Sequence, residues 1–158
     1  MNVHCAAWKT SQLRPRSETP VFFAFKMKPD EVSHFAFGVQ LFNQRKFFEA
    51  HEIWEKIWRS AEGDDKLFLQ GMIQAAAALI HTTSRNRRGA FSLYEKCCMK
   101  LKRLPAVWMK VDLERFRADL ALYFEGLRRF STLGDEPQRR CSERLHRNRP
   151  PTIHWVSD

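Results

Sequence analysis

Residues 47–58, with the sequence FFEAHEIWEKIW, decide the fold. Their large apolar side chains recur every three or four positions, which is the period of an amphipathic α-helix. On a helical wheel Trp54 lies inside the apolar arc, and His51 and Glu55 lie one turn apart at its edge. The stretch therefore predicts a helix that buries Trp54 and holds two ionisable groups at the margin of the core.

The helical period continues on both sides of this stretch and predicts an all-α protein with about five helices. Asn86 is a good N-cap for one of them, and Pro105 must lie beyond the end of that helix. The expected helices span about residues 30–43, 46–60, 65–83, 87–104 and 112–130.

A weak internal repeat relates the first two expected helices to the next two with an offset of 40 residues. It pairs Gly38 with Ala78 and Trp54 with Tyr94. Small residues let paired helices approach closely, and large ones fill the space between them. This pattern is typical of tetratricopeptide-like repeats, so we expect two antiparallel helical hairpins with the fifth helix as a cap.

The two ends of the chain are expected to lie outside one helical domain of residues 29–130. Residues 1–28 are basic and show no helical period, which fits a flexible extension, a transit-type peptide, or a start codon placed too early. We favour the last interpretation, with Met27 as the natural beginning. Residues 131–158 combine Pro with Arg and are predicted to form a flexible tail. Both ends are expected to be dispensable for folding.

Charge and composition narrow the class of protein. The formal net charge of +9 favours acidic partners without specifying one. No run approaches the roughly 18 apolar residues of a membrane span, so no membrane role is expected. The cysteines form no C-x-x-C pair, which predicts reduced thiols and a cytoplasmic location rather than a disulfide or zinc framework. They are Cys5, Cys97, Cys98 and Cys141.

The helix expected at 65–83 carries a polar stripe that matches the one on the preceding helix. Gln70, Gln74 and His81 fall within about 40° of one another on the wheel. Because buried polar groups need hydrogen-bond partners, we predict one contiguous cluster where the two helices meet. A satisfied structural network and a ligand-binding or catalytic site both remain open. The candidate residues are His51, Glu52, Glu55, Gln70, Gln74 and His81.

The segment from His51 to Glu55 is similar to the H-E-x-x-H zinc helix, but Glu55 stands where that motif has its second His. The motif therefore does not predict a metal site, and His51, Glu55 and His81 are only weak candidate ligands. No cofactor follows from the sequence.

The stretch from about residue 35 to residue 104 resembles an uncharacterised family of small helical proteins, domain of unknown function 309. The resemblance implies an all-α fold and no known activity. A Gly commonly precedes Asn86 in such proteins, where this chain has Arg85. The family-like features are Phe42-Asn43, residues 47–52, Trp54-Glu55, Trp58, Phe68, Gln70-Gly71, Ile73-Gln74, Ala76, Ala78, His81, Asn86, Gly89-Ala90 and Leu93.

Three function classes compete. We favour a binding or scaffold module with a polar pocket and an unidentified protein or small-molecule partner. The first alternative is a small-molecule or metal-dependent enzyme that uses His51, Glu55 and His81, so enzymatic activity stays an open question. The least favoured class is nucleic-acid binding, because the aromatic residues occupy core positions rather than exposed stacking platforms. Its candidate basic face comprises Arg85, Arg87, Arg88, Lys96, Lys100, Lys102 and Arg103.

Overall fold

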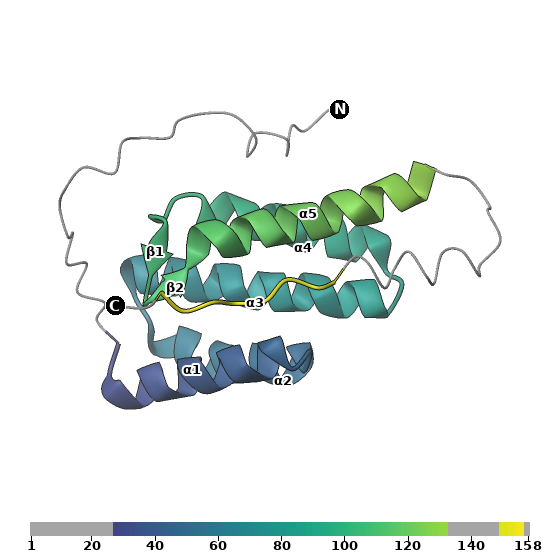
Figure 1. The fold of residues 1–158 in the computed structure, drawn as a ribbon. Helices are drawn as coiled ribbons and strands as arrows, with labels where there is room; N and C mark the ends of the chain where they lie inside the picture. Colours follow the sequence, from purple (N-terminus) through teal and green to yellow (C-terminus); the bar gives the residue numbers. More distant parts are fainter. Residues whose placement is uncertain (1–26, 133–148, 157–158) are drawn as a thin grey trace, which may run out of the picture.

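The structure, a computed structural model, describes residues 27–132 and 149–156. Within these residues the chain forms five helices and one two-stranded antiparallel sheet (Figure 1), which confirms the predicted all-α class. The elements are α1 (Pro29–Asn43), α2 (Phe47–Ser60), α3 (Gly63–Thr83), α4 (Arg87–Leu101), β1 (Val107–Trp108), β2 (Val111–Asp112) and α5 (Leu113–Thr132).

The helices begin where the sequence provides capping groups. Pro29 is the first residue of α1, and the backbone N–H of Lys28 donates to Oε2 of Glu31 at 2.9 Å. Asn86 caps α4, because its Oδ1 accepts a 3.0 Å hydrogen bond from the backbone N–H of Gly89. Each cap accepts a hydrogen bond from a backbone N–H group that the start of the helix would otherwise leave without a partner.

Helices that follow one another in the chain pack against one another. α1 contacts α2, α2 contacts α3, and α3 contacts α4, while α5 packs mainly on α4 and β1. Figure 1 shows α3 between the α1–α2 pair and the α4–α5 pair. Short turns join the first four helices, so their directions alternate. The tetratricopeptide-like character of this arrangement stays a prediction.

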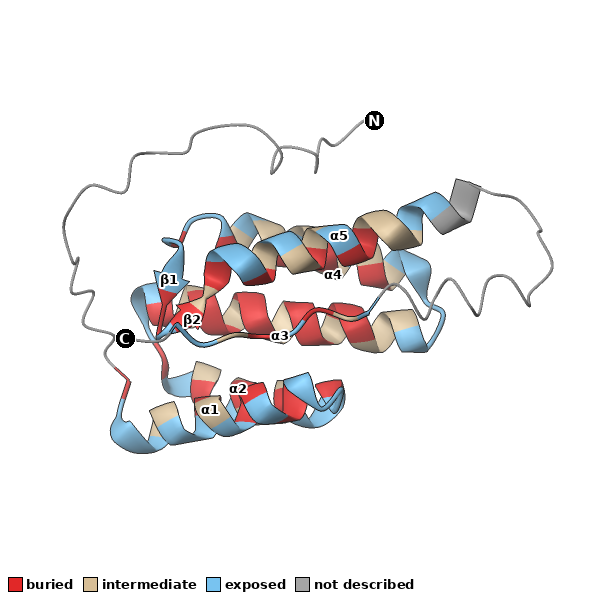
Figure 2. Cartoon of the chain, in the orientation of Figure 1, coloured by how far each residue is buried: buried red, intermediate tan, exposed pale blue. Residues whose placement is uncertain are grey.

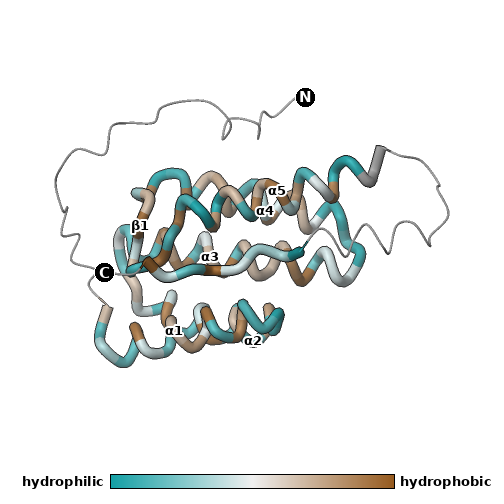
Figure 3. The backbone as a smooth tube through the Cα atoms, in the orientation of Figure 1, coloured by the Kyte–Doolittle hydropathy of each residue, from teal (hydrophilic) through white to brown (hydrophobic). Residues whose placement is uncertain are grey.

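Trp54 lies at the centre of the core, as its wheel position predicts. Its ring is fully buried and stacks on Phe35 with centroids 5.9 Å apart, and it lies 5.7 Å from the ring of Phe42. Gly38 makes room for it, since a Cβ atom there would lie 2.2 Å from Nε1 of Trp54. Figure 2 shows buried residues along the length of α3, and Figure 3 shows hydrophilic residues gathered at the turns and outer surfaces.

The two turns related by the predicted 40-residue offset have the same backbone geometry. Arg45 and Arg85 both adopt positive φ, at 67° and 56°. Lys46 N–H donates to the carbonyl of Leu41 at 2.9 Å, and Asn86 N–H donates to that of His81 at 2.9 Å. The left-handed conformation explains why a Gly commonly stands before Asn86 in the family that the chain resembles.

We expect the substitution Arg85→Gly to stabilise the protein by about 0.5–1 kcal/mol. It relieves about 1–2 kcal/mol of left-handed strain, while the added freedom of the unfolded chain costs about 0.4–1 kcal/mol. Urea unfolding measures the difference. Lys96→Gly is the control, because Lys96 is an exposed residue in the middle of α4, where Gly is expected to cost about 1 kcal/mol. If both variants lose stability to the same extent, the backbone of Arg85 does not have the left-handed conformation.

A short hairpin stands between α4 and α5, in the interval between Pro105 and about Asp112 for which the sequence predicted no helix. β1 pairs with β2 so that Trp108 faces Val111, and the turn residues Met109 and Lys110 have φ of 50° and 61°. Two positive φ angles define the tight hairpin turn that usually contains Asn or Gly. This turn contains neither, so the sequence signal for it is missing. Nε1 of Trp108 donates to the buried Asp65 at 3.2 Å, which ties the hairpin to α3.

The predicted flexible tail is wrong for residues 149–156, which pack on the helical domain as a C-terminal segment. Trp155 forms a β-bridge with Val111, and Val156 N–H donates to the carbonyl of Lys110 at 2.7 Å. On the other side Asn43 holds the backbone of Ile153 through two hydrogen bonds of 2.9 and 2.8 Å. Ile153 itself is 2% exposed, so this segment completes the core.

The remaining predictions for the ends of the chain fall mostly outside the described residues, which exclude 1–26, 133–148 and 157–158. Met27 belongs to the predicted extension but is buried in the core. That the ends of the chain are dispensable for folding therefore stays a proposal for residues 1–26, 133–148 and 157–158, and it no longer extends to 149–156.

We expect Asn43→Ala to lower the free energy of unfolding by about 1–2 kcal/mol, because both backbone groups of Ile153 lose their partner. Chemical denaturation measures the loss, and hydrogen exchange at the Ile153 amide reports whether the C-terminal segment is released. Gln40→Ala, at an exposed position of the same helix, is the control and should change stability by less than about 0.5 kcal/mol. Wild-type stability of Asn43→Ala would show that the segment contributes nothing to the fold.

Candidate functional site

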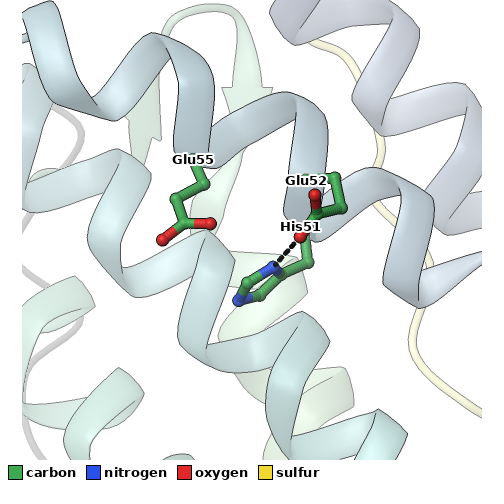
Figure 4. A group of neighbouring side chains, drawn as sticks. All are labelled: His51, Glu52 and Glu55. Atoms are coloured by element: carbon green, nitrogen blue, oxygen red, sulfur yellow. Dashed lines mark ion pairs between the residues drawn. The ribbon is translucent and has the colours of Figure 1, made fainter.

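Helix α2 brings three potential metal ligands together. His51, Glu52 and Glu55 each offer one ligand atom, and these atoms all lie within 4.8 Å of one another. Nδ1 of His51 lies 3.6 Å from Oε1 of Glu52, which is too long for a hydrogen bond but suits two ligands of one ion. Figure 4 shows the three side chains converging beside the helix. The side chain of His51 is 25% exposed and that of Glu52 is 49% exposed, so solvent reaches the group.

The carboxylates of this group have no Lys or Arg partner in the part of the chain that the structure describes, where the ion pair of Glu52 is the 3.6 Å contact with His51. There, Glu52 contacts no Lys or Arg within ion-pair distance, and Glu55 forms no hydrogen bond or ion pair. Nδ1 of His51 is itself buried and has no hydrogen-bond partner. Two carboxylates beside an unpaired imidazole nitrogen make a place suited to a positively charged ligand.

The group lies at one end of a polar seam between α2 and α3. Nζ of Lys66 lies 5.1 Å from the centroid of the Trp58 ring, so the last turns of α2 lie beside the first turn of α3. Because they run in opposite directions, Gln70 lies at the level of Glu55 and Gln74 at the level of His51. We define the seam as six half-buried residues: His51, Glu55, Trp58, Lys66, Gln70 and Gln74.

The seam also holds three buried polar atoms that have no hydrogen-bond partner among the described residues. They are Nδ1 of His51, Nε1 of Trp58 and Oε1 of Gln74. Folded proteins leave few buried polar atoms unpaired, and each such atom raises the question of what it serves. The hydrogen-bond network predicted for these residues therefore does not close among the described residues.

The structure places the six predicted site residues in two locations. His51, Glu52 and Glu55 lie together on α2, and Gln70 and Gln74 lie across the seam on α3. His81 does not join them: its Nδ1 lies 3.0 Å from Nδ2 of Asn86 in the turn before α4. It is separated from Gln74 by two turns of α3, about 10 Å along the helix axis, and so lies beyond the start of α2. The third potential ligand beside His51 and Glu55 is Glu52.

Sequence reasoning missed two residues of the seam, Trp58 and Lys66. Both had a signal in helical spacing, since Trp58 follows Glu55 by three positions and Lys66 precedes Gln70 by four. The wheel angle of Trp58 falls in the apolar arc of its helix, which predicts a core residue, and nothing in the sequence around Lys66 identifies its role. Only the contact between the two helices shows them to be partners.

The basic residues proposed for nucleic-acid binding lie on α4 and the turns at its two ends. Nη2 of Arg87 donates to the carbonyl of Leu127 at 2.6 Å, so this side chain links α4 to α5. Within the described ranges the exposed large aromatic side chains are Phe37, Phe48 and Trp155, none of which lies on α4. The basic face thus has no stacking platform beside it.

Fold and seam together define the chain as a small helical protein with a carboxylate–imidazole group on one helix. Residues 35–93 match the sequence profile of the Domain of unknown function (DUF309), so this region is similar to that family. The matched region runs from α1 into α4 and contains the whole seam. No curated protein matches the chain. None of the helices in the described residues is both long and apolar enough to cross a membrane.

Proposed function

We propose that the domain is a binding module whose ligand occupies the α2–α3 seam and includes a divalent transition-metal ion. The observation that carries the proposal is the convergence of His51, Glu52 and Glu55, whose ligand atoms lie within 4.8 Å of one another. One imidazole and two carboxylates suit zinc, manganese, iron or cobalt better than they suit calcium, which prefers a larger set of oxygen ligands.

Three protein ligands leave further coordination positions free for water or for a second molecule. This feature favours a metal-dependent enzyme as the second candidate function, since structural sites usually occupy every position with protein ligands. The seam residues Trp58 and Gln74 supply a hydrogen-bond donor and an acceptor on the same side of the domain. They support a bound molecule without defining a reaction.

We expect the full chain to bind one Mn²⁺ or Zn²⁺ ion and His51→Gln to lower the affinity at least about 10–100-fold, since even partners behind a ligand contribute that much. Isothermal titration calorimetry on metal-free protein without a polyhistidine tag measures the affinity. Binding should also weaken on acidification, because the ligands must be deprotonated.

His34→Gln is the matched control, because His34 is an exposed histidine of α1, away from the seam. Its metal affinity should equal that of the wild type. Circular dichroism checks that both variants keep their helices. A folded His51→Gln variant that binds metal as tightly as the wild type would exclude His51 as a ligand.

A further inference from the structure

We infer that the seam takes a small oxyanion, a phosphate or carboxylate group, which bridges the metal ion to Trp58 and Lys66. This inference rests on the proposed metal site. It gives a binding role to Trp58 and Lys66, the seam residues beside the three metal ligands. It also names the class of molecule that fills the open coordination positions of the metal.

Trp58 supplies the first observation. Nε1 of its indole is buried and has no acceptor among the described residues. An indole nitrogen is a donor only, so its partner must be an acceptor such as an oxygen atom. The neighbouring acceptor on α2 is Glu55, which forms no hydrogen bond with it and belongs to the metal group. The indole N–H is therefore available for an oxygen of a ligand.

Lys66 supplies the second observation. Its ammonium group lies over the Trp58 ring, 5.1 Å from the centroid, and forms no ion pair with a carboxylate in the described part of the chain. A flexible side chain with an unpaired positive charge thus stands beside an unpaired N–H donor. One cation and one N–H donor at the same place recognise an anionic oxygen group.

Trp58 lies within one to two helical turns of the metal group along α2. Along α2 the axial separation from Trp58 is about 4.5 Å to Glu55 and about 10 Å to His51. One oxygen of the anion occupies an open position on the metal, and its other oxygens accept from Nε1 of Trp58 and Nζ of Lys66. Across the seam, Oε1 of Gln74 is a buried acceptor without a partner, so the ligand also offers a hydroxyl or amine donor.

The experiment measures Mn²⁺ binding to the full chain in the presence and absence of inorganic phosphate, with acetate as a parallel arm. We expect the matching anion to strengthen Mn²⁺ binding about tenfold, and Mn²⁺ to strengthen binding of that anion by the same factor, because coupling between two ligands is reciprocal. Whichever of phosphate and acetate has the larger effect identifies the head group.

Trp58→Phe removes the N–H and keeps an aromatic ring, and Lys66→Met removes the charge and keeps the length of the side chain. Both variants should lose the effect of the anion and keep the Mn²⁺ affinity measured without it. Lys56→Met, at an exposed position of α2, is the control and should keep both.

The outcomes separate the two proposals. If the wild type binds no metal, the proposed function fails and the bridging role fails with it. If metal binds and neither anion changes its affinity, the oxyanion site is overturned while the metal site stands. If Trp58→Phe weakens Mn²⁺ binding without any anion, the indole N–H positions Glu55, and the oxyanion site is again overturned.

Discussion

Replacing Trp54 with Ala should lower the free energy of unfolding by about 3–5 kcal/mol, the usual cost of truncating a large buried aromatic residue. The side chain is fully buried between Phe35 and Phe42, and its Nε1 donates to the carbonyl of Phe35 at 3.2 Å. The substitution therefore leaves a cavity at the junction of α1 and α2 and removes a buried hydrogen bond. Urea unfolding followed by circular dichroism measures the loss.

Phe48→Ala is the matched control for Trp54→Ala. Phe48 is also an aromatic residue of α2, but it is 60% exposed. Its replacement should change stability by less than about 0.5 kcal/mol. Similar losses for the two variants would show that the buried face of α2 is assigned wrongly, and with it the position of His51 and Glu55 at the margin.

The second large effect is expected at Arg117, where Arg→Met should cost about 2–3 kcal/mol. The guanidinium donates to the carbonyls of Leu101 at 3.0 Å, Leu104 at 3.3 Å and Pro105 at 3.0 Å. These carbonyls lie at the end of α4 and just beyond it, so one side chain of α5 satisfies groups that would otherwise lack partners. Burial lowers the pKa of Arg117, but an arginine stays protonated in a protein.

Two further variants test the geometry of Arg117. Arg117→Lys keeps the charge, but its single ammonium cannot reach three carbonyls as the planar guanidinium does, so we expect at least half of the loss to remain. Arg115→Met removes an exposed arginine two positions away and should change stability by less than about 0.5 kcal/mol. Full stability of Arg117→Lys would mean that charge alone, rather than the fork of donors, holds the end of α4.

The candidate site was predictable as far as it depends on one helix. His51 and Glu55 meet because residues four apart lie on one side of a helix, and Glu52 lies three residues before Glu55, so this spacing is visible in the sequence. The wheel angle of His81 on α3 predicted that it belongs to the candidate site, but the structure places it beside Asn86 in the turn before α4. A helical wheel gives the angle of a residue around its own helix, but it does not give the position of that residue along the facing helix. His81 has a suitable angle, but it lies beyond the start of α2 and so cannot join the group.

The sequence by itself determined the helices, their caps and the burial of Trp54, because these depend on apolar period and on groups within a few residues of one another. The tertiary structure decided which helix faces meet, and so joined Trp58 to Lys66 in one seam. It also decided the β1–β2 hairpin and the docking of residues 149–156 on Asn43, which lies 110 residues away from Ile153 in the chain. Such contacts join distant segments through backbone hydrogen bonds, and these leave no periodic signal in the residues that form them.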